Sequence, residues 1–170
     1  QNQWYEIDVA TAGFGQGVAV TPIQMVRAVA SIANGGKLME PHVVASVIKE
    51  DGSEAAISSK VEREVISEKT AKLLTEMMVN AVDNGEAKFA KPKGYRIAGK
   101  TGTAQISIKG HYDPERTIAS FVGFAPADDP RFVMLVKLDE PQTSPFGSET
   151  AAPLFFTIAR KLFTYYNIPP

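Results

Sequence analysis

The stretch Ala98-Gly99-Lys100-Thr101-Gly102-Thr103-Ala104-Gln105 decides how this chain is organised. Residues 95–98 before it and 106–108 after it alternate in the manner of a β-strand, so the pattern predicts one strand through the whole stretch. A glycine weakens a strand unless another group must come close to its backbone, so Gly99 and Gly102 predict the close approach of a ligand or a helix. One ammonium and two hydroxyl groups lie beside these glycines, and we therefore expect an anionic ligand.

Lys100-Thr101-Gly102 resembles the Lys-Thr-Gly element of the penicillin-recognising serine enzymes. The extended form, residues 98–105, is similar to the class B penicillin-binding proteins, which are the peptidoglycan D,D-transpeptidases. Other segments match this family in the expected order. They are GFGQG at 13–17, TPIQM at 21–25, ANGG at 33–36 and SFVGFAP at 120–126. The resemblance covers nearly the whole chain and implies the fold shared by penicillin-binding transpeptidases and serine β-lactamases.

The other two catalytic elements of the resembled family are a Ser-x-x-Lys nucleophile and a Ser-x-Asn element. No serine of this chain is followed by asparagine two positions later, and the only Ser-x-x-Lys string is Ser46–Lys49. It lies in the β-branched stretch 41–48, which predicts a strand, and residues three apart in a strand point to opposite faces. Ser46 is therefore not assigned as the nucleophile. We expect residues 1–170 to be the C-terminal portion of one transpeptidase domain whose nucleophile-bearing N-terminal portion is absent.

The composition is that of a single globular domain, with 170 residues of which 44% are hydrophobic and 22% charged. The 18 basic and 19 acidic residues are interspersed, so no nucleic-acid partner is expected. No apolar run approaches the roughly 20 residues that span a bilayer, so no transmembrane segment is expected in this chain. The chain starts at Gln1, which fits a piece of a longer protein, and any membrane anchor is expected outside it.

Cysteine is absent, which excludes disulfides and thiol catalysis within the chain. The two histidines, His42 and His111, are far apart in sequence, so neither a metal site nor a cofactor is expected.

Periodicity predicts helices and strands in an order typical of an α+β fold, an antiparallel sheet covered by helices and incomplete in this chain. Helices are predicted over 21–33, 67–84 and from about 150 to 163. A peripheral hairpin is predicted within 37–66. The central strand, 118–124 and 132–138 predict an antiparallel meander. Residues 4–9 are predicted to be extended, and 109–116 to be a turn-rich connection.

The family resemblance implies roles for the residues of the central strand. Lys100 supplies positive potential and a donor to the missing Ser-x-Asn element. Thr101 and Thr103 offer hydroxyls to a substrate carboxylate, and the Thr103 N–H forms half of an oxyanion hole. Gly102 lets the substrate backbone lie antiparallel to the strand, and Gln105 completes the substrate-binding set. The loop with His111 and Tyr112 is a candidate rim of the groove.

The implied function is penicillin binding and D,D-transpeptidation of D-Ala-D-Ala stem peptides, as part of a larger enzyme at the extracytoplasmic face of the bacterial inner membrane. The implied partners are peptidoglycan stem peptides, β-lactams, the missing N-terminal portion, and the division or elongation machinery. One alternative is a serine β-lactamase or D,D-carboxypeptidase relative. The other is a non-catalytic interaction module with an incidental Lys-Thr-Gly, in which Lys100 would be buried or in an ion pair away from any groove.

Overall fold

The computed structural model describes residues 4–13, 15–108 and 111–170. The helices are α1 (Glu6–Ala12), α2 (Pro22–Ala33), α3 (Glu68–Asn84), the 3-10 helix η1 (Glu86–Ala90) and α4 (Ala151–Tyr165). The strands are β1 (Lys37–Met39), β2 (Ser46–Ile48), β3 (Glu54–Ala56), β4 (Val61–Glu64), β5 (Ala98–Ile108), β6 (His111–Ala125) and β7 (Phe132–Asp139). Within the described part, no helix combines the length and apolarity needed to cross a membrane.

A three-stranded antiparallel sheet in the order β5–β6–β7 forms the centre of the molecule. Lys100 of β5 lies opposite Val122 of β6, and Phe121 of β6 lies opposite Val136 of β7. The meander predicted from the sequence is therefore confirmed. Among the described residues β5 and β7 are the two edges of this sheet, because each pairs with β6 alone.

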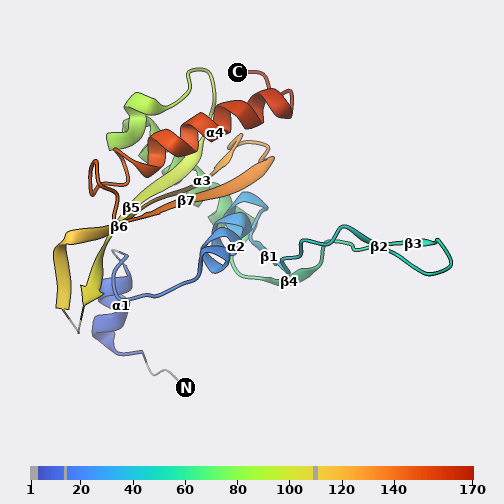
Figure 1. Cartoon of the computed structure of the whole chain (residues 1–170), viewed down its shortest axis with the longest axis horizontal. Coiled ribbons are helices and arrows are strands. Elements are labelled where there is room, and N and C mark those ends of the chain that lie inside the picture. Colours follow the sequence, from blue (N-terminus) through green and yellow to red (C-terminus); the bar gives the residue numbers. More distant parts are fainter. Residues whose placement is uncertain (1–3, 14, 109–110) are drawn as a thin grey trace.

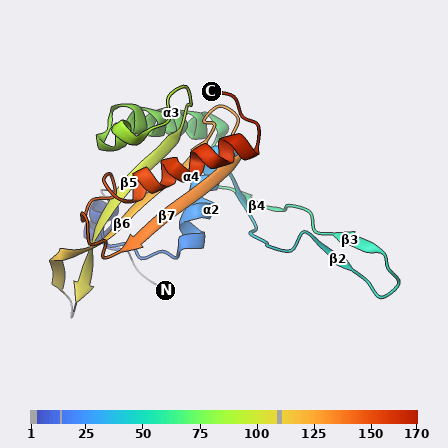
Figure 2. The ribbon, with the colours of Figure 1, turned by 45° about the horizontal axis from the view of Figure 1, so that its top comes forward.

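Helices cover both faces of the sheet, with α4 on one face and α2 with the adjoining α3 on the other (Figures 1 and 2). The α4 face holds a cluster of buried aromatic rings, in which the Phe121 ring lies 4.6 Å from that of Phe155 and 5.2 Å from that of Phe156. Each such aromatic pair adds about 0.5–1.5 kcal/mol beyond the area it buries. The predicted α+β architecture is confirmed.

The second core lies on the opposite face, where Val29 of α2 and Val79 of α3 pack against Ala98 and Phe124 of the sheet. Because side chains of a strand alternate between its faces, Ala98 and Phe124 serve this core while Phe121 serves the aromatic one. Ala98, the first residue of β5, belongs to this second core, and Ile97 just before it belongs to the aromatic one, so both cores hold the start of the strand that carries the Lys-Thr-Gly element.

The two predicted helices that flank this core have the expected N-terminal caps. Thr21 Oγ1 accepts a hydrogen bond from the Gln24 N–H at 3.3 Å, and Ser67 Oγ accepts one from the Thr70 N–H at 3.2 Å. A serine or threonine cap of this kind contributes about 1 kcal/mol. Pro22 occupies the first helical position of α2, where a backbone N–H would have no hydrogen-bond partner within the helix, so its absence in proline costs no hydrogen bond.

Residues 37–64 form a narrow two-stranded ribbon that extends away from the body of the molecule (Figure 1). At its base β1 pairs with β4, and towards its tip β2 pairs with β3. Ser46 lies in β2, opposite Ala56. The predicted hairpin is confirmed. Ser46 lies in a strand, as predicted, and so it does not share a helix face with Lys49.

Two segments differ from the prediction. Residues 6–12 form helix α1, whereas residues 4–9 were expected to be extended; the Asp8 carboxylate caps the helix by accepting from the Tyr5 N–H at 2.9 Å. The supposed turn-rich connection is instead a continuation of the sheet, because β5 runs on to Ile108 and β6 begins at His111. Residues 109–110, at the end of this hairpin, lie outside the described residues.

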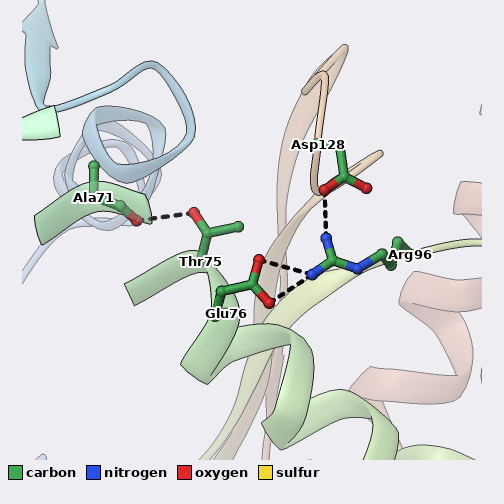
Figure 3. Close-up of polar contacts among 5 residues, drawn as sticks. All are labelled: Ala71, Thr75, Glu76, Arg96 and Asp128. Carbon is green, nitrogen blue, oxygen red and sulfur yellow. Dashed lines mark hydrogen bonds and ion pairs between the residues drawn. The ribbon is translucent and has the colours of Figure 1, made fainter. Parts of the chain in front are cut away.

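Arg96, just before β5, ties the sheet to α3. Figure 3 shows its guanidinium between Glu76 of α3 and Asp128 of the turn that joins β6 to β7. Both Glu76 carboxylate oxygens accept from Arg96 Nη2, at 2.7 and 2.6 Å, and Asp128 accepts from Nη1. The hydrogen bonds to Glu76 and then to Asp128 raise the pKa of Arg96 above its ordinary value.

Candidate active site

The Lys-Thr-Gly element lies on β5 along an open edge of the sheet. The Lys100, Thr103 and Gln105 side chains are exposed, and Thr101 is half-buried. The predicted site residues Lys100, Thr101, Gly102, Thr103 and Gln105 all lie on this one strand, at an accessible edge.

Their side chains divide between the two faces of the strand, because neighbouring residues of a strand alternate. Lys100 shares a face with Ala98, which packs towards α2 and α3. Thr103 lies on the α4 face, where its hydroxyl meets the segment that leads into α4. A ligand that contacts both residues must therefore lie along the edge itself.

The orientation of the β5 peptide groups follows from a close approach at Gly147. A Cβ built on Gly147 would lie 2.5 Å from both the Gly102 and the Ser120 carbonyl oxygens, and 3.1 Å from the Ser120 nitrogen. Gly102 and Ser120 are paired across β5 and β6. Their two carbonyl oxygens can lie this close to one point only if each is directed towards the other strand. The Gly102 carbonyl therefore points inward, into the ladder between β5 and β6. Because peptide groups alternate in direction along a strand, those of Thr101 and Thr103 face the open edge.

The Lys100 ammonium lies against this same edge. Lys100 Nζ donates to the Thr101 carbonyl oxygen at 3.1 Å and to Thr101 Oγ1 at 3.3 Å. Among the described residues Lys100 forms no ion pair, although eight other basic–acidic pairs occur in this part of the chain. An incidental Lys-Thr-Gly predicts a buried or ion-paired lysine, and the exposed Lys100 contradicts that expectation.

The two glycines of β5 are explained by contacts within the chain. A Cβ on Gly99 would lie 2.5 Å from Cζ of the buried Phe121 ring. A Cβ on Gly102 would lie 2.5 Å from Ser120 Oγ. The predicted close approach is therefore real at both positions, but the approaching groups are side chains of the neighbouring strand β6.

The segment Pro145–Ser148, which precedes α4, was missed by the sequence analysis. The Gly147 N–H donates to Thr103 Oγ1 at 3.1 Å and brings this segment onto the predicted site. The cluster of serine, proline and glycine at 144–148 marks a turn, but nothing in the sequence places that turn beside a residue 44 positions earlier.

The candidate rim residues lie on the extension of the same hairpin. Tyr112 pairs with Ser107 and its side chain is 54% exposed. The backbone of His111 pairs with Ile108, and its side chain lies outside the described part of the chain. Both residues lie on β6, in the part of the hairpin beyond the register shift that follows Gln105 of β5.

A cavity of about 520 Å³ lies elsewhere, between the end of α2, the start of α3 and the turn at Ala127–Pro130. None of its lining residues belongs to 100–105. In residues 4–13, 15–108 and 111–170, no three His, Cys, Asp or Glu side chains come together in a way that could hold a metal ion.

The penicillin-binding protein transpeptidase domain matches this chain over residues 1–162. The fold and the position of the Lys-Thr-Gly strand at a sheet edge are both consistent with this match. The chain belongs to the family of penicillin-binding protein transpeptidase domains.

Named relatives and solved structures support this membership. The chain is 41% identical to Stage V sporulation protein D of Bacillus subtilis, over 96% of this chain and 26% of that protein. It is 37% identical to peptidoglycan D,D-transpeptidase FtsI of Buchnera aphidicola, over 100% of this chain and 29% of that protein. The crystal structure of penicillin-binding protein 3 from Mycobacterium tuberculosis, complexed with ampicillin, superposes with a TM-score of 0.89 at 33% identity, over 98% of this chain and 39% of that chain. The chain thus spans less than a third of the length of the two curated relatives.

Proposed function

We propose that this chain is the C-terminal portion of a serine-type D,D-transpeptidase domain, and that β5 forms one wall of a site for β-lactams and for the D-Ala-D-Ala ends of peptidoglycan stem peptides. The nucleophilic serine comes from an N-terminal portion of the same domain, so the chain is inactive by itself. The observation that carries the proposal is the Lys100–Thr103 element, which lies along an open sheet edge with Lys100 and Thr103 exposed and with Lys100 in no ion pair among the described residues.

In the proposed reaction, the serine oxygen attacks the carbonyl carbon of the penultimate D-Ala. The carbonyl oxygen becomes an oxyanion, the C–N bond to the terminal D-Ala breaks, and that D-Ala leaves as the amine with the proton that the serine gave up. An amine of a neighbouring strand then attacks the acyl carbon, the bond to the serine oxygen breaks, and the serine regains a proton from that amine. In this proposal the Thr103 N–H, which faces the open edge, donates to that oxyanion. Removal of one such donor typically lowers the rate about 10²- to 10³-fold.

The substrate carboxylate meets the hydroxyl and ammonium groups of the same edge. Thr101 and Thr103 donate from their hydroxyls, and Lys100 supplies positive charge that no ion pair within the described residues neutralises. Charge-assisted hydrogen bonds of this type are about twice as strong as neutral ones. Gly102 and Gln105 line the path of the substrate backbone, and Tyr112 and His111 form its rim.

The cellular setting in this proposal is the extracytoplasmic face of the bacterial inner membrane, with an anchor outside this chain. The relatives named for peptidoglycan D,D-transpeptidation and for sporulation favour a role in cell-wall synthesis. The enzyme works with the division or elongation machinery. No nucleic acid, metal or cofactor takes part.

Labelling with a fluorescent penicillin tests the proposal. We expect covalent labelling of the intact transpeptidase that contains this chain, and none of the chain alone. Lys100→Ala lowers the labelling rate of the intact enzyme by at least about 100-fold, the scale of one preorganised electrostatic group. Labelling of the chain alone would show that it carries its own nucleophile and would overturn the proposal.

A matched control removes a lysine from the far edge of the same sheet. Lys137 lies on β7 and pairs with Asp139. Lys137→Ala keeps the wild-type labelling rate. The rate of deacylation distinguishes the alternative enzyme classes, because a β-lactamase releases the label quickly whereas a transpeptidase keeps it.

A further inference from the structure

We propose that Gly147 is a positioning residue for the carboxylate clamp: its amide orients the Thr103 hydroxyl so that the hydroxyl hydrogen points to the bound anion. This inference rests on the proposed function of β5. It concerns a residue of the segment before α4 that belongs to neither the Lys-Thr-Gly element nor the sheet.

The first observation is the direction of the hydrogen bond. The Gly147 N–H donates to Thr103 Oγ1 at 3.1 Å. An amide N–H can only donate, so Thr103 Oγ1 accepts here, and a hydroxyl that accepts one bond still has its own hydrogen to donate. Thr103 is exposed on the open edge, and its remaining hydrogen therefore serves an anion arriving from solvent.

The second observation is that only glycine fits at position 147. A Cβ there would lie 2.5 Å from the Gly102 and Ser120 carbonyl oxygens. Close carbon–oxygen contacts in proteins measure about 3.3–3.6 Å, so a side chain would move the segment off the sheet by roughly 1 Å. That displacement breaks the bond from the Gly147 N–H to Thr103.

The third observation is that both flanks of Gly147 are anchored by buried side chains. Thr117, which is 5% exposed, donates from Oγ1 to the Pro145 carbonyl oxygen at 2.9 Å. Ser148, which is 4% exposed, donates from Oγ to a Glu86 carboxylate oxygen at 3.2 Å. These contacts hold the amide against Thr103 before any substrate arrives, as electrostatic preorganisation requires.

The test compares benzylpenicillin with its methyl ester, which lacks the carboxylate, in the intact enzyme. Gly147→Ala lowers the acylation rate with benzylpenicillin by about 10- to 100-fold, the loss expected for a hydrogen bond to a charged group. Acylation by the ester changes by less than about threefold, because the ester has no charge for the oriented hydroxyl to meet. An equal loss with both compounds would mean a general disturbance of the site and would overturn the inference.

A double-mutant cycle adds a second readout. If Gly147 acts through Thr103, adding Gly147→Ala to Thr103→Val causes no further loss with benzylpenicillin, because neighbouring residues in one interaction are not additive. A full additional loss overturns the inference. Gly36→Ala is the control for steric strain alone, since its Cβ would lie 2.0 Å from the Ile66 carbonyl oxygen at the base of the ribbon; it destabilises the protein but affects acid and ester equally.

Hydrogen–deuterium exchange keeps the inference testable even if Gly147→Ala fails to fold. In the intact enzyme, exchange at the Gly147 amide is slow in wild type and in Thr103→Ser, which retains the oxygen, and faster in Thr103→Val. Equal exchange in all three contradicts the contact on which the inference rests. If the wild-type enzyme is not acylated by benzylpenicillin at all, the proposed function is wrong. If the wild-type enzyme is acylated but Gly147→Ala slows acylation by the acid and by the ester equally, only this inference is wrong.

Discussion

At the scale of single residues, the glycines of β5 show how packing fixes the active strand. Gly99 lies above the Phe121 ring, which is 1% exposed and enclosed by the aromatic cluster under α4. The ring has no free space to move into, because protein cores are close-packed. Gly99, which leaves room for the Phe121 ring in the core, directly precedes Lys100 in β5.

Gly99→Ala is therefore expected to lower the free energy of unfolding by about 1–3 kcal/mol, the usual cost of overpacking a core. Urea denaturation followed by circular dichroism measures the change. Gly13→Ala is the control, because its Cβ would approach no atom closer than 3.3 Å and the residue is exposed. An unchanged midpoint for Gly99→Ala would show that the Phe121 ring can yield.

At the scale of elements, two ion-pair groups join parts of the chain that are distant in sequence. Arg96 links α3, the start of β5 and the turn at Asp128. Its side chain is 37% exposed, and the Glu76 and Asp128 side chains 63% and 67%, so each pair is solvent-screened. Exposed pairs contribute about 0.2–1 kcal/mol each.

Arg96→Met is expected to lower the free energy of unfolding by about 1 kcal/mol at low salt, and by less in 1 M salt, where the Debye length falls to about 3 Å. Urea denaturation at both salt concentrations measures the difference. Lys72→Met breaks a single exposed helix pair with Glu68 and serves as the control, with an effect of at most about 0.5 kcal/mol. An effect of Arg96→Met that is the same at both salt concentrations would indicate lost packing instead of lost charge pairing.

The second group joins β6 to the end of β7. Arg116 donates from Nε and Nη2 to the two Glu140 carboxylate oxygens at 2.8 and 2.6 Å, and these hydrogen bonds hold the pKa of Glu140 below its ordinary value of 4.5. A lowered carboxylate pKa stabilises the folded state above the unfolded pKa, and this contribution disappears as the pH falls through the folded pKa.

Acidification from about pH 6 to pH 3 should therefore destabilise the intact wild-type domain more than the same domain with Glu140→Gln, which has no carboxylate to protonate at this position. Free energies of unfolding at a series of pH values test this. Glu149→Gln, whose carboxylate forms no ion pair in the described part of the chain, should retain the wild-type pH dependence. If Glu140→Gln retained it as well, the Arg116–Glu140 pair would contribute nothing measurable.

At the scale of the whole molecule, large apolar side chains remain uncovered on the helices. Ile23 of α2 is 53% exposed, and Leu73 and Met77 of α3 are 62% and 59% exposed. The edge strand β7 also lacks a second neighbour among the described residues. Exposed apolar patches and open sheet edges favour association with another polypeptide.

The chain alone is therefore expected to self-associate and to bind a hydrophobic dye such as ANS, whereas a mixture with the N-terminal portion of the domain gives a 1:1 complex without dye binding. Light scattering coupled to size-exclusion chromatography measures the assembly. A monomeric chain that binds neither the dye nor the N-terminal portion would contradict the proposal that the domain is incomplete.

The sequence predicted the elements whose signals are local. Thr21 and Pro22 mark the start of α2, Ser67 marks that of α3, and alternation marks the β5–β6–β7 meander. Helix α1 escaped prediction because Ile7 and Val9 favour strands, and none of its residues is buried to provide a helical stripe.

At the candidate site, the strand and its exposed residues could be predicted because the Lys-Thr-Gly element is contiguous. The partners of its glycines could not, since Phe121 and Ser120 come close only through the β5–β6 register. The contact of Gly147 with Thr103 depends on how the segment before α4 crosses the sheet, which is a tertiary property without a local signal.

The ribbon of residues 37–64 offers a practical advantage of another kind. Glu50, in the turn between β2 and β3, is exposed. The β2–β3 end of the ribbon extends away from the body, on the side opposite β5 and β6 (Figure 1). Because the chain contains no cysteine, Glu50→Cys would introduce its single thiol at this tip. A fluorophore attached there would label the domain, and a linker attached there would fix it to a surface. Either attachment would leave the Lys100 edge free for ligands.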